Sequence, residues 1–387
     1  MSPRPDPDIV PFHRPWITPT EEREMVEVLR SGWLTMGPRT IEFEDKFRDY
    51  LGVGQAVAVS SGTAALHLAL ILAQVRPGDE VITTPLTYAA TANEIVHVGA
   101  KPVFCDVLPE TLCLDPDAVE AALNKKTRAV LPVHYGGLAA PMNRYQAICR
   151  EHGLALLADC AHALETRIDG KSIALAGDMA AFSFYPNKNI TTGEGGMLTL
   201  ADPDQAARAR RLRLHGFDQN SWRKYENGHL PVYRLDEIGY KYNMNDIQAV
   251  LGTGQLKRVE NMWERRRRIT EIYRSELDSL DSISLQPDQP NVRQAHHLFV
   301  VKLGPEFTEA QRNEVMNKLR QGGMGCSIHY FPLHLQPFYQ KALGLGPGAL
   351  PVAEAAAERV ISLPIYPLMT DEQVGLVSDA LKRALSG

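Results

Sequence analysis

Short apolar runs alternate with helix-length segments between about residue 55 and residue 200 of the chain. The runs read AVAVS, EVITT, PVFCDV, RAVLPV, LALLAD and AAFSF. This alternation of strand-like and helix-like periodicity predicts an α/β protein whose mostly parallel sheet is covered by helices on both faces. Ligands gather at the carboxyl ends of the strands in such sheets, so we expect the chemistry-bearing residues directly after the apolar runs.

The pattern changes after Tyr242. Residues 245–280 form a long helical pattern with little punctuation, and a proline-bearing loop, the strand-like HHLFVVKL, a helix, IHYFPLH and a final helix follow. This order predicts a large domain over residues 12–250 and a smaller α+β domain over residues 251–387, joined by a long helix. Neither an internal repeat nor a low-complexity segment is present.

Composition limits the class of protein. The 387 residues are 44% hydrophobic and 22% charged, which is ordinary for a folded globular chain and excludes general disorder. A net charge of −5 gives no sign of a nucleic acid or a membrane surface as partner. There is no run of about 18 apolar residues and no signal-peptide core. The five cysteines form no CxxC pair, so we expect reduced thiols and a cytoplasmic protein.

The segment SSGTAAL, residues 60–66, joins a predicted strand to a predicted helix. Small residues such as Gly62 and Thr63 let backbone N–H groups approach an anion at the positive end of that helix. An ordinary turn with Thr63 near the helix cap would have the same sequence. The turn is therefore a candidate phosphate site only in combination with other residues.

A second candidate is LLADCAHALE, residues 156–165, in which Asp159 ends an apolar run and His162 follows three residues later. Asp159 could cap the next segment while His162 packs nearby, or the carboxylate could hold a proton on a ligand nitrogen. Cys160 lies between them and is interpreted as a small packing residue.

Lys188 lies in FSFYPNKNITTGEGGM, 29 residues after Asp159 and five after Ser183. An imine between a lysine and an aldehyde cofactor needs an amine that is partly neutral and held in place, whereas most lysines are solvated. The ordered set of anion-binding turn, aspartate, serine and lysine fits pyridoxal 5′-phosphate (PLP). Its phosphate needs hydrogen-bond donors, its ring nitrogen a carboxylate and its aldehyde an amine.

Eight segments occur in the order typical of one protein family. They are SGWLTMGPRT, SSGTAALHLAL, GDEVITTPLTYAATANEI, PVHYGG, LADCAHALET, FSFYPNKNITTGEGGM, LRLHGF and GYKYNMNDIQAVLG. In this order, and from about Pro11 to the C-terminus, the chain resembles the DegT/DnrJ/StrS nucleotide-sugar aminotransferases. The resemblance implies fold type I of the PLP enzymes, with a seven-stranded sheet in the large domain, and a homodimer with active sites at the subunit interface.

The resemblance also implies roles for single residues. Lys188 matches the Schiff-base lysine, which would also move a proton, and Asp159 matches the partner of the pyridine nitrogen. His162 matches the polar residue near the phenolic oxygen, and Tyr88 the aromatic residue that stacks on the ring. The residues that match phosphate contacts are Gly62, Thr63 and Ser183.

One loop departs from the family pattern, because this chain has GYKYNM at residues 239–244 where many members have GYNYRM. In relatives the loop reaches the cofactor phosphate of the neighbouring subunit, so Lys241 or Asn243 is expected there. Substrate contacts are assigned by position to His134 and His329, with Trp33 and Tyr330 as neighbours. Each of these histidines could equally be structural.

The sequence motifs GYKYN and SGWxTxGP are similar to those of the family branch that forms 4-amino-4-deoxy sugars. We therefore expect an aminotransferase for a nucleotide-linked 4-keto (6-deoxy) sugar, with L-glutamate as amino donor. Alternatives are a 3-ketosugar aminotransferase, a related PLP-dependent sugar dehydratase, and a non-catalytic regulatory or sensor protein. The dehydratase has histidine in place of the lysine, so Lys188 argues against it. The sensor would not need the complete set of lysine, aspartate and serine.

Overall fold

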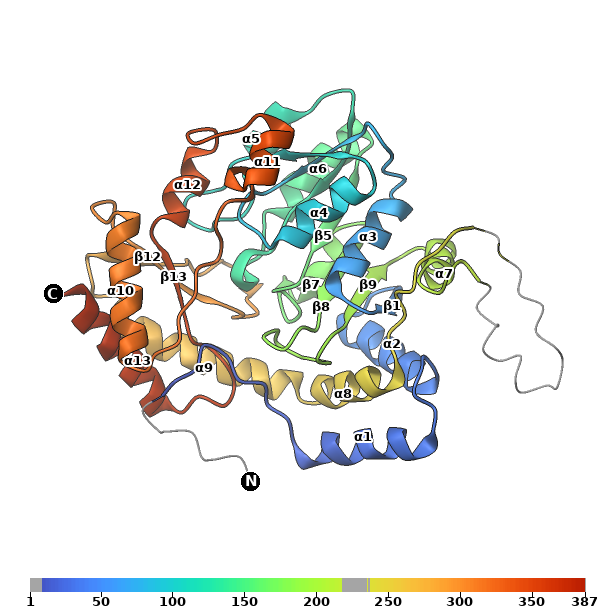
Figure 1. Cartoon of the computed structure of the whole chain (residues 1–387), viewed down its shortest axis with the longest axis horizontal. Helices are drawn as coiled ribbons and strands as arrows, with labels where there is room; N and C mark the ends of the chain where they lie inside the picture. Colours follow the sequence, from blue (N-terminus) through green and yellow to red (C-terminus); the bar gives the residue numbers. More distant parts are fainter. Residues whose placement is uncertain (1–8, 218–234, 236, 387) are drawn as a thin grey trace.

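The computed structural model describes residues 9–217, 235 and 237–386 (Figure 1). Its main feature is a seven-stranded sheet with the strand order β1-β9-β8-β5-β4-β2-β3. These strands are β1 (Gln55–Val59), β2 (Glu80–Thr83), β3 (Lys101–Phe104), β4 (Thr127–Leu131), β5 (Ala155–Asp159), β8 (Met179–Ser183) and β9 (Gly196–Leu200). Only β9 runs antiparallel to its neighbours, β1 and β8. The predicted mostly parallel sheet is therefore confirmed.

Helices cover both faces of this sheet, as the alternating pattern predicts. Successive residues of β1 belong to opposite cores: Val57 and Val59 pack with one set of helices, and Ala56 and Ala58 with the other. The first set is α3 (Gly62–Leu72), α4 (Ala89–His97) and α7 (Pro203–Leu212). The second set includes α2 (Pro38–Leu51), α5 (Pro116–Ala122), α6 (Met142–His152) and α8 (Asp246–Leu256).

A smaller unit follows in the C-terminal part of the chain. Its three-stranded sheet has the order β10-β12-β13, from β10 (Ile283–Leu285), β12 (Phe299–Leu303) and β13 (Val360–Leu363). Helices α9 (Val259–Leu277), α10 (Glu309–Gln321) and α13 (Asp371–Leu385) share a separate apolar core with these strands (Figure 1). A minor sheet pairs β6 (Arg167–Ile168) with β7 (Lys171–Ser172) and with β11 (Val292–Arg293).

The connection between the two units differs from the predicted single long helix. Helix α8 ends at Leu256 and α9 begins at Val259, so a short turn separates them. At this turn the Arg258 guanidinium donates to the carbonyl of Trp16 (3.0 Å) and to the carboxylate of Glu21 (2.6 Å). The turn is thus stabilised by contacts with the N-terminal segment, and local helical periodicity cannot reveal it.

Two short C-terminal helices pack on the large sheet's core. These are α11 (Pro337–Leu343) and α12 (Pro351–Ala357), which lie near α5 (Figure 1). The carboxylate of Asp106 accepts hydrogen bonds from the backbone N–H groups of Val352 (2.9 Å) and Ala353 (2.8 Å). The segment after residue 250 therefore contributes to both cores. Among the described residues, no helix has the length and apolarity needed to cross a membrane.

Candidate active site

A cavity of about 540 Å³ opens where β1, β5 and β8 end. Nine of the residues singled out in the sequence line it: Gly62, Thr63, Tyr88, Asp159, His162, Ser183, Lys188, His329 and Tyr330. They come from segments spread over most of the chain, including the C-terminal part. The cavity lies at the carboxyl ends of the strands, where ligands are expected to bind in such a sheet.

The turn between β1 and α3 forms one end of the cavity. Ser61, rather than Thr63, is the N-cap residue, and its hydroxyl accepts from the N–H of Ala64 at 3.0 Å. The turn is packed tightly against β9: a Cβ atom on Gly196 would lie 2.4 Å from the carbonyl carbon of Ser61. The backbone N–H groups at the start of α3 are therefore held rigidly at the cavity, where a helix N-terminus favours an anion.

Asp159 is the last residue of β5 and is buried. One carboxylate oxygen accepts from the hydroxyl of Thr91 (2.8 Å), and the other accepts from the N–H of Ala161 (3.0 Å). Burial raises the pKa of Asp159, and its hydrogen bonds and the nearby Lys188 ammonium oppose this effect. The direction of the carboxylate is thus fixed, and a positively charged partner would lower its pKa.

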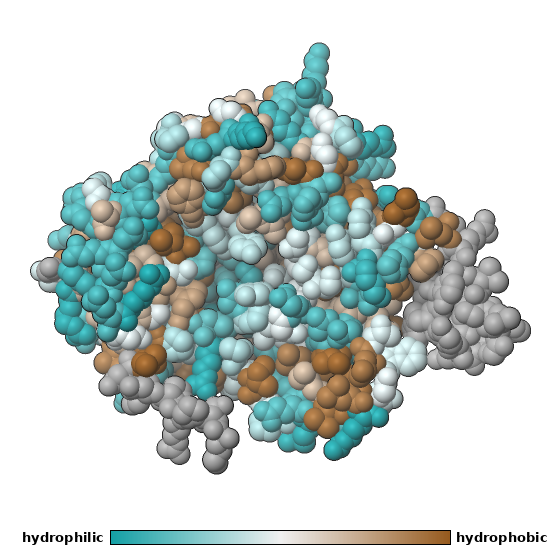
Figure 2. Space-filling view, viewed as in Figure 1, coloured by the Kyte–Doolittle hydropathy of each residue, from teal (hydrophilic) through white to brown (hydrophobic). Residues whose placement is uncertain are grey.

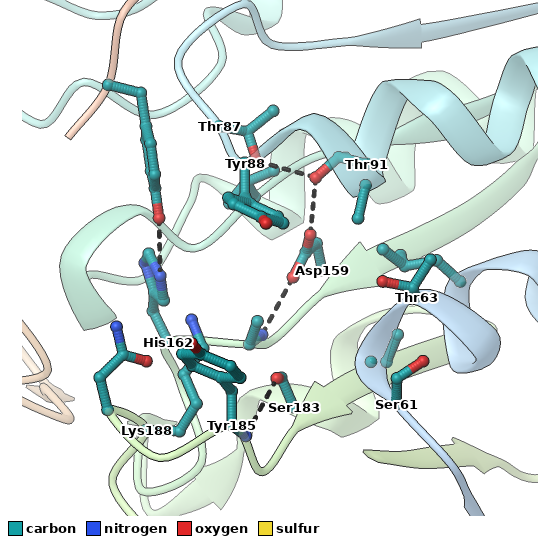
Figure 3. Close-up of a pocket in the computed structure, with 18 of the residues that line it drawn as sticks. Ser61, Thr63, Thr87, Tyr88, Thr91, Asp159, His162, Ser183, Tyr185 and Lys188 are labelled. Atoms are coloured by element: carbon teal, nitrogen blue, oxygen red, sulfur yellow. Dashed lines mark hydrogen bonds between the residues drawn. The ribbon is translucent and has the colours of Figure 1, made fainter. Parts of the chain in front are cut away.

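Lys188 points into the same space as Asp159 (Figure 3). Burial lowers the pKa of its amine to about 8, although the Asp159 carboxylate raises it. At pH 7 about a tenth of such an amine is neutral, compared with less than about one part in a thousand for a solvated lysine. The side chain therefore meets the requirement of a positioned, partly neutral nucleophile.

His162 has both ring nitrogens engaged. Its Nδ1 lies 3.3 Å from the N–H of Gly136, and its Nε2 lies 3.1 Å from the hydroxyl of Tyr330. Burial, followed by the positive charge of Lys188, holds the pKa of His162 well below its usual value, so the imidazole is neutral. Tyr88 projects into the cavity with 68% of its surface exposed, which leaves a flat aromatic face available to a ligand.

The other assigned residues are placed differently. His329 lines the cavity but directs its Nδ1 to the hydroxyl of Ser362 (2.8 Å). His134 is fully buried, and its Nδ1 accepts from the N–H of Ala140 (3.1 Å). The structure thus keeps His134 out of the cavity, as a core histidine would be. Trp33 also lies outside it, in the connection between α1 (Pro19–Ser31) and α2, and donates to the carbonyl of Met36 (3.2 Å).

Lys241 and Asn243 do not line the cavity of their own chain. Their segment pairs along the sheet edge, with bridges from Lys241 to Leu214 and from Asn243 to Val59. Lys241 is exposed, and the side-chain amide of Asn243 donates to the carbonyl of Met244 at 3.4 Å. Neither position therefore contributes to a site within one chain.

Sequence reasoning missed several lining residues. Thr87 lies just before Tyr88, the N-cap residue of α4, and Thr91 lies in the first turn of that helix; their hydroxyls are 2.8 Å apart. Their i, i+4 spacing on either side of Tyr88 was the available signal. Four further polar side chains, none of them singled out in the sequence, line the cavity: Tyr185, Asn187, Glu194 and Ser327.

The sequence profile of the DegT/DnrJ/EryC1/StrS aminotransferase family matches residues 15–382. The chain belongs to this family. It is 43% identical over 377 residues to the uncharacterized protein MJ1066 of Methanocaldococcus jannaschii, covering 97% of this chain and 98% of that protein. It is 41% identical over 379 residues to the spore coat polysaccharide biosynthesis protein SpsC of Bacillus subtilis, covering 98% and 97%.

Solved structures of the family are closely similar. The aminotransferase TlmJ from Streptoalloteichus hindustanus superposes with a TM-score of 0.90 at 34% identity, covering 98% of this chain and 99% of that one. PseC from Helicobacter pylori, an aminotransferase involved in the biosynthesis of pseudoaminic acid, gives 0.91 at 26% identity, with the same coverage. The PLP form of Spr1654 from Streptococcus pneumoniae gives 0.91 at 32% identity, covering 98% and 99%.

This protein is thus a PLP-dependent sugar aminotransferase with the fold expected from its sequence. The regulatory alternative is not supported. The residues present fit the cofactor: the cavity joins a helix N-terminus, an exposed aromatic face, a buried carboxylate and an amine of lowered pKa. These are the four groups that a phosphorylated pyridine aldehyde requires.

Proposed function

We propose that the protein transfers an amino group from L-glutamate to carbon 4 of a nucleotide-linked 4-keto (6-deoxy) sugar. The observation that carries the transaminase chemistry is the joint position of the Lys188 amine and the Asp159 carboxylate in one cavity. The choice of carbon 4 is supported by SGWLTMGP at residues 31–38 and GYKYN at residues 239–243. Relatives that act in spore coat polysaccharide and pseudoaminic acid biosynthesis support a sugar acceptor.

We assign the following roles to the side chains. PLP, when bound, supplies an aldehyde that bonds to amines and a ring that takes up electrons. Asp159 would accept a hydrogen bond from the ring nitrogen and, as a carboxylate, keep that nitrogen protonated. Tyr88 would stack on one face of the ring, and His162 would lie near the phenolic oxygen. The phosphate would bind the start of α3, at Gly62 and Thr63, and the nearby Ser183.

Lys188 has two tasks in this proposal. It would hold the cofactor covalently, and its free amine, kept in the cavity, would remove the proton from the α-carbon of the amino donor. A pKa near 8 suits the second task, because the amine can both take up and release a proton close to neutral pH.

We further propose that the active enzyme is a homodimer. Several large apolar side chains of α1 and the following connection are exposed, and Figure 2 shows an apolar surface at this end of the molecule. They are Val26, Leu29, Trp33 and Leu34. A second copy covering this surface would explain their exposure. Such a dimer would let Lys241 or Asn243 reach the partner's phosphate, since neither serves its own chain.

The test is to incubate the PLP-loaded enzyme with L-glutamate and a panel of UDP-, dTDP- and GDP-linked ketosugars, and to locate the new amine by NMR. An amine at carbon 4 supports the proposal. An amine at carbon 3 would instead establish the 3-ketosugar alternative. A Lys188→Ala variant serves as the control for transfer that does not depend on the enzyme.

A further inference from the structure

A second layer of buried polar side chains lies behind the wall of the cavity. It consists of Glu165, Asn189 and His297, none of which lines the cavity itself. They come from three parts of the chain: the loop after β5, the position next to Lys188, and the connection between β11 and β12. Burying three polar side chains is unfavourable unless their hydrogen bonds are satisfied, so their arrangement needs an explanation.

The orientation of the Asn189 amide is determined by its neighbours. Its Nδ2 lies 2.7 Å from Oε2 of Glu165 and 2.9 Å from the carbonyl oxygen of Ala295. Both partners are acceptors, so both amide hydrogens are used. The amide oxygen then faces Nδ1 of His297 at 2.9 Å, and that nitrogen must carry the hydrogen. Burial keeps His297 neutral by holding its pKa well below the usual value, so its Nε2 has the lone pair.

His297 in turn supports His162. The two imidazoles stack with centroids 4.3 Å apart and an angle of 30° between their planes. Nδ1 of His162 faces the N–H of Gly136, which is a donor, so the hydrogen of this neutral ring lies on Nε2. That hydrogen is donated to the hydroxyl oxygen of Tyr330. The hydroxyl hydrogen of Tyr330 is then free to point into the cavity, which Tyr330 lines.

We propose that Glu165, Asn189 and His297 form a positioning chain that fixes the plane of the His162 ring, whose tautomer is set by the N–H of Gly136, so that Tyr330 presents a hydrogen-bond donor to the bound ligand. The ligand atom opposite Tyr330 is therefore an acceptor oxygen. Tyr330 contacts the ligand, whereas the three residues of the chain act through His162. The proposal depends on the aminotransferase activity of the site and not on which ketosugar it uses.

Glu165 is suited to the start of this chain because it offers only an acceptor to Asn189. Burial raises the pKa of Glu165 to about 7, against the attraction of the buried Arg266 guanidinium. Oε2 of Glu165 accepts from the amide, and its Oε1 has no hydrogen-bond partner among the described residues, so Oε1 can carry the proton while Oε2 stays an acceptor. Replacement by leucine removes the acceptor, and the Asn189 amide is then free to turn over and offer its Nδ2 to His297. Glutamine keeps an acceptor oxygen of the same size at this position, which makes it a matched control.

The first test uses the wild-type holoenzyme and needs no substrate. Long-range ¹H–¹⁵N spectra of histidine-labelled protein distinguish the two neutral tautomers, and His297→Gln and His162→Gln spectra assign the signals. We expect a hydrogen on Nδ1 of His297 and on Nε2 of His162. The opposite tautomer at either residue overturns the proposal. In Glu165→Leu, the His297 signals should become those of a mixture of tautomers.

The second test is a double-mutant cycle that combines Glu165→Leu with Tyr330→Phe. The visible absorption of the holoenzyme monitors the rate of the half-reaction with L-glutamate in each variant. Glu165→Leu should lower the maximal rate about tenfold with little change in the half-saturating glutamate concentration, and Glu165→Gln less than about threefold. In a Tyr330→Phe background, Glu165→Leu should lower the rate less than twofold. A tenfold loss there as well, or equal losses in the leucine and glutamine variants, would show that Glu165 is only structural. If the wild-type enzyme performs the half-reaction with L-glutamate but aminates no ketosugar, that result counts against the acceptor proposed above and leaves the positioning chain standing.

Discussion

The hydroxyl of Thr91 donates a hydrogen bond of 2.8 Å to the carboxylate of Asp159. Thr91 lies in α4 and Asp159 ends β5, so this bond joins a helix to the strand that presents the carboxylate. With the N–H of Ala161 on the other oxygen, it determines the plane in which the carboxylate faces the cavity. The direction of the group that would pair with the cofactor nitrogen therefore depends on Thr91, a residue of the GDEVITTPLTYAATANEI segment to which the family resemblance assigns no role.

Thr91→Val should weaken PLP binding and lower turnover, each by roughly tenfold, because it removes a hydrogen bond to a buried carboxylate. Cofactor titration of the apoenzyme, followed by absorbance, measures the first effect, and steady-state kinetics the second. Thr91→Ser keeps the hydroxyl and is the matched control. Equal binding by the valine variant and the wild type would show that Ala161 alone orients Asp159.

Lys188→Ala should abolish the yellow colour of the holoenzyme and lower turnover by at least about a thousandfold, because no other lysine of the described residues lines the cavity. Lys188→Arg retains the positive charge and should be equally inactive, since a guanidinium does not deprotonate near neutral pH. Absorption spectra and turnover of both variants are the measurement. A yellow, active Lys188→Ala enzyme would require another lysine in the role.

The Lys188 pKa of about 8 gives a pH dependence with a definite sign. Only the neutral amine attacks the PLP aldehyde, so the rate at which apoenzyme combines with PLP should rise with pH and level off above about pH 8. Stopped-flow absorbance measures this rate. The folded-state pKa is lowered from 10.5, so between about pH 8 and pH 10.5 the unfolded chain binds more protons at this residue.

Between about pH 8 and pH 10.5, the contribution of Lys188 to the free energy of unfolding of the apoenzyme should therefore increase as the pH rises. Comparing urea unfolding of wild type and Lys188→Met isolates this contribution, since the variant lacks the titrating amine. If the combination rate rose only above about pH 10, the amine would be solvated rather than buried.

Gly196→Ala should weaken PLP binding and destabilise the fold by about 1–3 kcal/mol, because its Cβ would press on the backbone of Ser61. Gly375→Ala in α13 is the control: a Cβ there meets open space, and alanine favours the helix by up to about 1 kcal/mol. Thermal unfolding and cofactor titration of both variants are the measurements. A Gly196→Ala enzyme with wild-type affinity for PLP would mean that the turn can shift without cost.

Much of the site can be predicted from sequence because a parallel sheet brings distant strand ends together. Asp159 and Ser183 each end a strand, and Lys188 follows the second, so apolar runs alone place them at one edge. His134 follows the same rule and yet turns into the core, where its Nδ1 accepts from the N–H of Ala140. Position after a strand thus predicts the edge of the sheet, but not the direction of a side chain.

Contacts between distant segments explain what the sequence does not show. Asn189 and His297 are 108 residues apart, and neither carries a motif that would pair them. The break between α8 and α9 contains no glycine or proline and depends on hydrogen bonds from Arg258. Such features arise from tertiary packing, which overrides local propensity.

The attachment of α12 to Asp106 has a mechanical consequence. Both oxygens of that carboxylate are bonded to the helix backbone, and the same C-terminal segment supplies Tyr330 to the cavity wall. A large swing of the C-terminal half would have to break these bonds and uncover apolar surface. Substrate entry should therefore use small local shifts of loops and side chains at the opening of the cavity. The two halves of the subunit should keep the same relative position throughout turnover.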